Sequence, residues 1–243
     1  MERMAQHLSH LLGAAVRGPE AALSLLDLLS PEERQLTLHT FNDTASPYPS
    51  TLTVHQLFER AAEQWPSAVC LAAGSGRITY AAVNAAANQL AHWLVSRGVA
   101  AGCAVGVSLP KCPQLYVTLL AVLKAGGYYV PLDPELPADR AMFMLRQTGV
   151  QLLLAAASVR TAELSDVEVV VVDQGWQRFK DQPADNLQPR AGPADVAYCI
   201  FTSGSTGQPK VRLPVSGRTL PGARGQHAVS CPVPARWLCS ISM

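Results

Sequence analysis

A run of five valines and one glutamate at residues 167–172 constrains the fold of this chain more than any other feature. An antiparallel strand with one face in water alternates apolar and polar residues, whereas a nearly continuous apolar run is typical of a strand buried on both faces. Strands of that kind occur where helices cross over between parallel strands. We therefore predict an α/β fold with a mostly parallel sheet and flanking helices.

Helix and strand patterns alternate from residue 53 onward. Thr53 and Gln56 form a capping-box pattern that opens a helix, and Pro66 ends it. Gly74-Ser75-Gly76 separates two short apolar runs, which predicts a β-hairpin. Gly98 predicts the end of an alanine-rich helix. The further expected elements are strands at 103–109, 128–132, 150–155 and 167–172 and helices at 113–125 and 138–148.

The first part of the chain predicts a separate helical preface at residues 1–40. Its first two expected helices are 4–16 and 20–29, joined by Arg17-Gly18-Pro19. Ser30 and Pro31 predict the start of a third helix, in which Glu33 completes a capping box. A polar stretch with two prolines at 42–49 follows. We therefore predict a second domain at 41–210.

The charge of the chain is unevenly distributed. All 18 acidic residues and 15 of the 19 basic residues precede residue 211, whereas residues 211–243 contain four arginines and no acid. This last segment lacks apolar periodicity, which predicts a divergent, unstructured tail. Its arginines are dispersed and have no interleaved aromatic residues, so we expect no nucleic-acid partner.

The cysteines and histidines predict neither a disulfide framework nor a metal site. The six cysteines contain no C-x-x-C pair, and His7 and His10 lack further ligands nearby. No stretch approaches the roughly eighteen apolar residues of a membrane-spanning helix. The first residues do not have the pattern of a secretion signal. We therefore expect a cytoplasmic protein with reduced thiols and no membrane partner.

A loop rich in glycine and hydroxyl residues, 202–210, follows an apolar strand predicted at 196–201. Backbone N–H groups and hydroxyls in such a loop can bind phosphate oxygens, and Lys210 can balance their charge. The loop is not a Walker A loop, because Pro209 precedes the lysine and only two residues separate Gly204 from Gly207. From composition alone, an ordinary flexible loop stays an alternative.

The sequence from Tyr198 to Lys210 closely resembles the signature loop of the adenylate-forming enzymes, which include acyl-CoA synthetases and adenylation domains of non-ribosomal peptide synthetases. Residues 123–134, 78–80 and 42–59 resemble other motifs of the peptide-synthetase adenylation domains. The resemblance covers about residues 25 to 210. It implies the N-terminal part of an adenylation domain, and residues 1–40 resemble the connector that follows a condensation domain.

The resemblance also implies an activity. Such an enzyme joins an amino acid to ATP, giving an aminoacyl adenylate and pyrophosphate, and then loads a carrier-protein thiol. Mg²⁺ would offset the charge of the leaving pyrophosphate. No residue of the loop acts as a covalent nucleophile. The residues expected to hold the β- and γ-phosphates are Thr202, Ser203, Gly204, Ser205, Thr206, Gly207 and Lys210.

The resemblance ends directly after Lys210. The family continues with a glycine, a short apolar strand and a Ser-His pair, none of which follows here. We hypothesise that residues 211–243 are translated out of frame, and we expect a truncated adenylation domain without turnover of its own. Two alternatives stay open: a non-catalytic nucleotide-binding or interaction fragment, and a truncated acyl-CoA synthetase.

Overall fold

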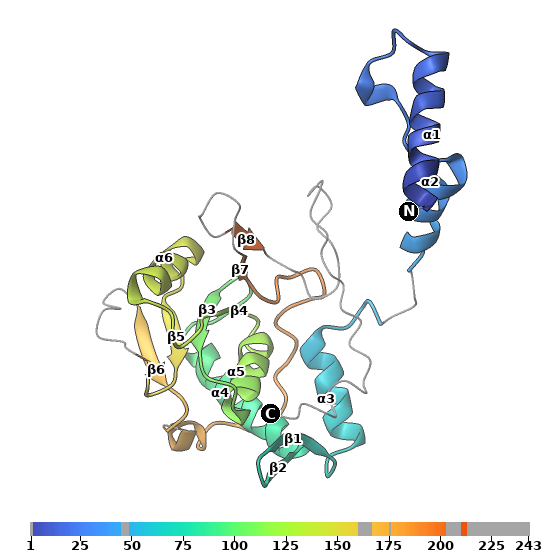
Figure 1. Cartoon of the computed structure of the whole chain (residues 1–243). Helices are drawn as coiled ribbons and strands as arrows, with labels where there is room; N and C mark the ends of the chain where they lie inside the picture. Colours follow the sequence, from blue (N-terminus) through green and yellow to red (C-terminus); the bar gives the residue numbers. More distant parts are fainter. Residues whose placement is uncertain (1, 45–48, 160–166, 175, 203–209, 213–243) are drawn as a thin grey trace. The chain divides into compact units, whose positions relative to one another are not determined.

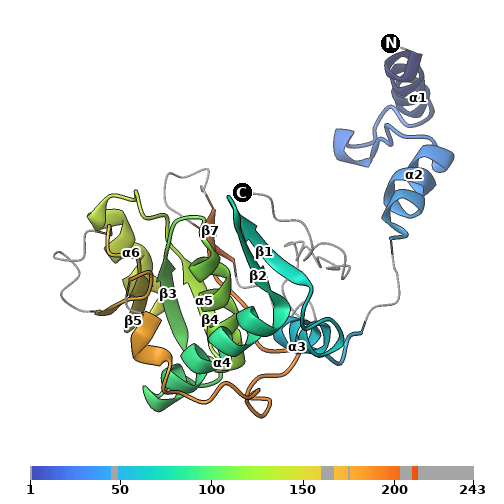
Figure 2. The same cartoon turned by 90° about the horizontal axis from the view of Figure 1, so that it is seen from below.

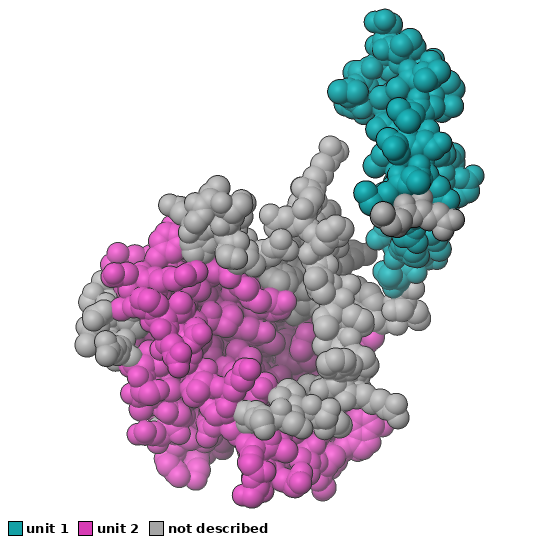
Figure 3. Space-filling view, viewed as in Figure 1, with its two compact units in different colours: residues 1–48 teal, residues 49–243 magenta. Residues whose placement is uncertain are grey.

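The structure is a computed structural model that describes residues 2–44, 49–159, 167–174, 176–202 and 210–212. The chain divides into two compact units, residues 1–48 and 49–243, which Figure 3 distinguishes by colour. Within the described ranges, no helix is long and apolar enough to cross a membrane.

The described residues of the first unit form two α-helices, α1 (Glu2–Arg17) and α2 (Pro31–Leu38), and two short 3-10 turns, Leu23–Leu25 and Thr40–Asn42. The predicted helix at 20–29 is wrong, since only the turn at Leu23–Leu25 forms there. Leu23 and Leu25 are 87% and 77% exposed. A short helix depends on packing an apolar face, and these two leucines stay largely exposed.

The start of α2 is partly as predicted. Ser30 is the N-cap, and its hydroxyl accepts a hydrogen bond from the Glu33 backbone N–H at 3.1 Å. The Glu33 carboxylate does not complete a capping box, because it forms a hydrogen bond with His7 Nε2 at 3.0 Å instead. The Glu33 side chain thus contacts His7 on α1 and not, as the local pattern predicted, the backbone N–H of Ser30.

The second unit contains the predicted parallel sheet. Its strand order is β4-β3-β5-β6, and every neighbouring pair is parallel. The bounds are β3 Ala104–Ser108, β4 Tyr128–Pro131, β5 Leu152–Ala155 and β6 Glu168–Val171. The prediction of an α/β fold with flanking helices is confirmed (Figure 1).

The helices and the hairpin of this unit also lie where the sequence predicts them. The helices are α3 Val54–Gln64, α4 Tyr80–Ser96, α5 Pro113–Lys124 and α6 Ala138–Thr148, and the hairpin strands are β1 Val69–Ala73 and β2 Gly76–Thr79. Thr53 and Gln56 form the full capping box. Gly98 follows α4 with φ +88°, the left-handed conformation that glycine favours at this position.

Alternating residues of the strands face two different cores. Val105 and Leu154 belong to a buried cluster with residues of α4 and α5, whereas Leu153 belongs to a second cluster with Leu145 of α6. Figures 1 and 2 show α6 and the α4–α5 pair on opposite faces of the sheet. Helices therefore cover both faces, which explains why the strands are nearly continuous apolar runs.

Candidate nucleotide-binding site

Both ends of the predicted phosphate loop lie in a small antiparallel hairpin. Strand β7 (Ile200–Thr202) pairs with β8 (Lys210–Arg212), and Thr202 is directly opposite Lys210. Ser203, Gly204, Ser205, Thr206 and Gly207 lie outside the described residues, so their predicted role stays a prediction. The hairpin holds the backbones of Thr202 and Lys210 side by side. Val211 and Arg212 complete β8, and residues 213–243 lie outside the described part of the chain.

The segment before β7 extends the parallel sheet beyond β4. Tyr198 forms a parallel bridge with Tyr129. The Tyr129 N–H donates to the Ala197 carbonyl at 3.3 Å, and the Cys199 N–H donates to the Tyr129 carbonyl at 2.9 Å. Since the segment runs parallel to β4, the chain reaches Thr202 beyond the carboxyl end of that strand. Open α/β sheets bind ligands at this edge.

The prediction of one continuous strand at 196–201 is wrong. Pairing with β4 stops after Cys199, and β7 pairs with β8 instead. The reason is Pro131, the last residue of β4. The next hydrogen bond of this parallel ladder would run from the backbone N–H of residue 131 to the Cys199 carbonyl. Proline has no N–H, so that hydrogen bond cannot form. The chain is thereby freed to form the hairpin that carries the loop.

Aromatic packing reinforces this junction. The rings of Tyr129 and Tyr198 stack with centroids 5.6 Å apart and planes 16° apart. Burial, together with the neighbouring Tyr198, raises the pKa of Tyr129 to about 12. Burial also raises the pKa of the Cys199 thiol, so this cysteine is a packed residue rather than an activated nucleophile. Local sequence patterns do not predict this contact, although Tyr129 and Tyr198 both lie in family motifs.

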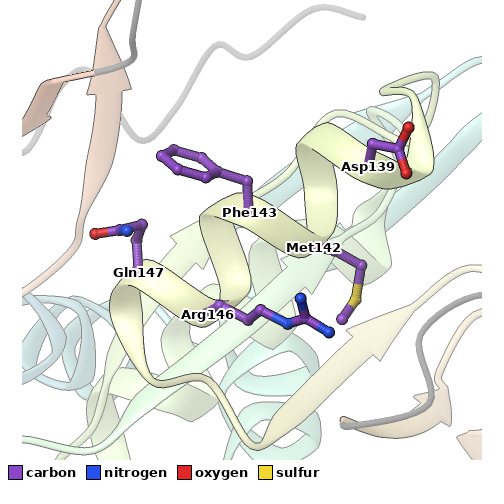
Figure 4. Close-up of a pocket in the computed structure, with 5 residues that line it drawn as sticks. All are labelled: Asp139, Met142, Phe143, Arg146 and Gln147. Atoms are coloured by element: carbon purple, nitrogen blue, oxygen red, sulfur yellow. The ribbon is translucent and has the colours of Figure 1, made fainter.

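A hollow on α6 lies elsewhere in the unit. Figure 4 shows its lining side chains, Asp139, Met142, Phe143, Arg146 and Gln147. All five come from one helix, so the hollow lacks the polar groups converging from several elements that fix a small ligand. It does not contribute to the candidate site.

Metal ligands can also be assessed in the described part of the chain. No group of three or more His, Cys, Asp or Glu side chains there could hold a metal ion. Four cysteines, at 70, 103, 112 and 199, are free thiols, while Cys231 and Cys239 lie outside the described residues. What the structure describes of the site is the paired backbone of Thr202 and Lys210.

Comparison with known protein families matches residues 58–211 to the family described as AMP-binding enzyme. The matched region begins in α3 and ends in β8. It therefore includes the parallel sheet, the candidate loop and the hairpin that holds it. Its last residue, 211, lies one residue after the point where the signature pattern is lost.

Several curated proteins are similar to this chain over most of its length. Gramicidin S synthase 2 from Brevibacillus brevis is 38% identical over 210 residues, which cover 86% of this chain and 5% of that protein. Surfactin synthase subunit 2 from Bacillus subtilis (strain 168) is 38% identical over 211 residues, which cover 86% of this chain and 6% of that protein. The chain thus spans only a small fraction of these relatives.

Solved structures give the same result. The AMPPNP-bound form of a variant of the nonribosomal peptide synthetase FmoA3 has a TM-score of 0.70 and 27% identity, covering 89% of this chain and 23% of that chain. Its α-methyl-L-serine-AMP-bound form has a TM-score of 0.68 and 29% identity, covering 79% of this chain and 20% of that chain. The N-terminal subdomain of Klebsiella oxytoca NpsA, at 23% identity and a TM-score of 0.58, shares the fold.

Proposed function

Because this chain belongs to the AMP-binding enzyme family, we propose that residues 41–210 are the N-terminal portion of an amino-acid-activating adenylation domain of a peptide synthetase. One observation carries the proposal: the β7–β8 hairpin holds Thr202 and Lys210 together beyond the carboxyl end of β4. This is the edge at which a parallel sheet presents a loop to a nucleotide.

The proposed reaction is adenylation of a carboxylate. An oxygen of the amino acid carboxylate forms a bond to the α-phosphorus of ATP, and the bond from that phosphorus to the β-phosphate oxygen breaks. Aminoacyl-AMP and pyrophosphate result. In a second step, a carrier-protein thiol takes the acyl group and AMP leaves.

The loop residues act by position and charge. Thr202, Ser203, Ser205 and Thr206 would direct hydroxyls and backbone N–H groups to the β- and γ-phosphate oxygens. Gly204 and Gly207 would let the backbone approach the phosphates closely. The Lys210 ammonium would stabilise the charge that develops on the leaving pyrophosphate.

Mg²⁺ is part of the proposal. It would offset phosphate charge, and we propose that the phosphate oxygens supply several of its ligands, as is common for Mg²⁺ in nucleotide sites. The residues that the structure describes contain no ready-made cluster of ligands. The metal would therefore arrive with the nucleotide.

The proposal extends to the rest of the chain. Residues 1–40 would connect to a preceding condensation domain, and the carrier protein would be a further partner. Residues 211–243 would be out of frame, which is supported by the end of the family match at residue 211. The chain by itself would then lack turnover. We propose that the protein is located in the cytoplasm.

Neither alternative has an observation in its favour. The relatives reported above are gramicidin and surfactin synthases and a nonribosomal peptide synthetase, rather than acyl-CoA synthetases. A non-catalytic module would need a site of another kind, and the hollow on α6, which a single helix lines, does not supply one.

The test is amino-acid-dependent exchange of pyrophosphate into ATP. Residues 1–210 are fused to the remainder of the matching domain of gramicidin S synthase 2, and exchange is measured with each proteinogenic amino acid. We expect exchange in the fusion, none in the 243-residue chain, and at least a tenfold loss in the Lys210→Ala fusion. Arg77→Ala, which removes an exposed basic residue of β2, is the control. A folded fusion without exchange would overturn the proposal.

A further inference from the structure

A strap formed by residues 180–190 lies along α4 and is held there by polar side chains of that helix. Figures 1 and 2 show this orange segment passing α4 and then turning toward β7. Each contact joins an α4 side chain to a carbonyl oxygen of the strap. They are Gln89 Nε2 to Lys180 O at 3.1 Å, Asn88 Nδ2 to Ala184 O at 2.7 Å and His92 Nε2 to Asp185 O at 3.2 Å.

Asn186 is the centre of the strongest attachment. Its side-chain oxygen accepts hydrogen bonds from Asn84 Nδ2 at 2.9 Å and Asn88 Nδ2 at 3.0 Å, both on α4. Lys124 Nζ on α5 lies 3.4 Å from the same oxygen. Asn88 and Lys124 are buried, at 0% and 2% exposure, so this one oxygen satisfies donors that water cannot reach.

The far end of the strap packs against the turn that leads into β4. Gly126 has φ +93°, and a Cβ built there would lie 3.0 Å from Arg190 Cβ and 3.2 Å from the Arg190 carbonyl oxygen. The strap is thus fixed at Asn186 and again at Arg190. Only a few residues later, the chain pairs with Tyr129 through Ala197 and Cys199.

We propose that Asn186 is a positioning residue for the phosphate loop. It fixes the strap on α4 and α5, and the strap delivers Ala197 and Cys199 to β4 in the register that places Thr202 beyond the carboxyl end of the sheet. The residue does not touch the nucleotide. Its effect reaches the loop through the pairing of residues 197–199 with Tyr129. Only the expected effect of Asn186 on ATP binding rests on the proposed function.

The test is amide hydrogen exchange of the full 243-residue chain. In Asn186→Ala, we expect the Cys199 amide to exchange about tenfold faster, because three hydrogen bonds onto one oxygen are lost. The Leu132 amide, which donates to Val107 O within the sheet, should keep its rate. Asn186→Asp keeps an acceptor oxygen for the same donors and should restore the protection of Cys199.

The outcomes are distinct. An unchanged Cys199 rate in Asn186→Ala overturns the inference, as does an equal acceleration of Leu132, which would show a general loss of stability. If Asn186→Ala does not fold, Asn84→Ala removes a single donor and is expected to accelerate Cys199 alone, by about threefold. MgATP affinity should fall about tenfold in Asn186→Ala and recover in Asn186→Asp. A wild-type chain that binds no MgATP would contradict nucleotide binding by this chain, while the exchange rates would still decide the role of Asn186.

Discussion

Lys124 Nζ on α5 donates to Glu59 Oε1 on α3 at a distance of 2.5 Å, and the lysine side chain is fully buried. Burial lowers the pKa of Lys124, and the hydrogen bond and charge of Glu59 oppose that shift. The pair joins two helices that are distant in sequence. Since Lys124 also reaches Asn186, the same ammonium links α3, α5 and the strap.

Glu59→Ala is therefore expected to destabilise the second unit by about 3–5 kcal/mol, because it leaves a buried ammonium without its partner. The measurement is the free energy of unfolding in urea, followed by tryptophan fluorescence. Glu135→Ala, which removes an exposed carboxylate of the same unit, is the control and should cost less than about 1 kcal/mol. Equal losses in the two variants would contradict the assignment. The double variant Glu59→Leu with Lys124→Met should recover part of the stability.

His55 predicts a loss of stability in mild acid. Burial, with a smaller effect of the Lys124 charge, lowers its pKa from 6.5 to about 4. Between these pH values the unfolded chain binds a proton that the folded chain excludes, so stability is complete above pH 6.5 and falls as the pH falls toward 4. From about pH 7.5 to about pH 5 the expected loss is about 2 kcal/mol.

Urea unfolding at these two pH values measures the effect of His55. His55→Gln should remove most of the pH dependence, whereas His39→Gln, an exposed histidine of the first unit, should leave it unchanged. The reason lies in the surroundings of the ring: Nε2 shares a hydrogen bond with Thr53 Oγ1 at 3.0 Å, and Nδ1 is buried without a partner in the described residues. A slope that persists in His55→Gln would assign the dependence to another group.

Local patterns predicted most elements of the second unit because its local and tertiary preferences agree. Thr53 and Gln56 cap a helix whose apolar face is then buried against α4, α5 and the β1–β2 hairpin, and the apolar run at 167–172 lies in a strand with helices on both faces. The helix expected at 20–29 did not form, and Leu23, Leu25 and Leu28 of its apolar side are exposed. Apolar periodicity shows that a helix has a face that can be buried. It does not show which other element of the fold packs against that face.

The candidate site was predictable as a string of residues, but its support was not. The loop was found because its residue types suit phosphate binding, whereas the bridge of Tyr198 to Tyr129 and the hydrogen bonds of Asn186 join positions far apart in the chain. Pro131 carried a usable signal. Its missing N–H ends the pairing with residues 197–199, but only knowledge of which strand lies beside β4 makes that signal readable.

Tyr198→Ala is expected to loosen the junction that carries the loop. Removal of the stacked ring should cost about 0.5–1.5 kcal/mol beyond the loss of buried area. The pKa of Tyr129 should also fall from about 12 toward 10, because its burial and the adjacent Tyr198 are the causes of the shift. Alkaline titration of tyrosine absorbance measures this change. Tyr198→Phe retains the stack and should keep most of the stability, so equal losses in both variants would contradict a role for the ring contact.

Gly126 and Gly102 offer a matched pair that tests the packing of the strap. Both have positive φ, +93° and +81°, so alanine at either position should cost about 1–2 kcal/mol in backbone strain. Only Gly126 faces a close neighbour, because a Cβ there meets Arg190 at 3.0 Å, whereas nothing lies within 4 Å of one at Gly102. Gly126→Ala should therefore cost about 1–3 kcal/mol more than Gly102→Ala.

The same two variants distinguish backbone strain at the glycine from displacement of the strap. Gly126→Ala pushes the strap at Arg190 and should accelerate amide exchange at Cys199, because that segment is paired to β4 only a few residues later. Gly102→Ala lies in an open turn and should leave the Cys199 rate unchanged relative to global stability. Equal unfolding free energies for the two variants, with equal Cys199 protection, would mean that the strap yields at Arg190 and that its position is not set by the turn at Gly126.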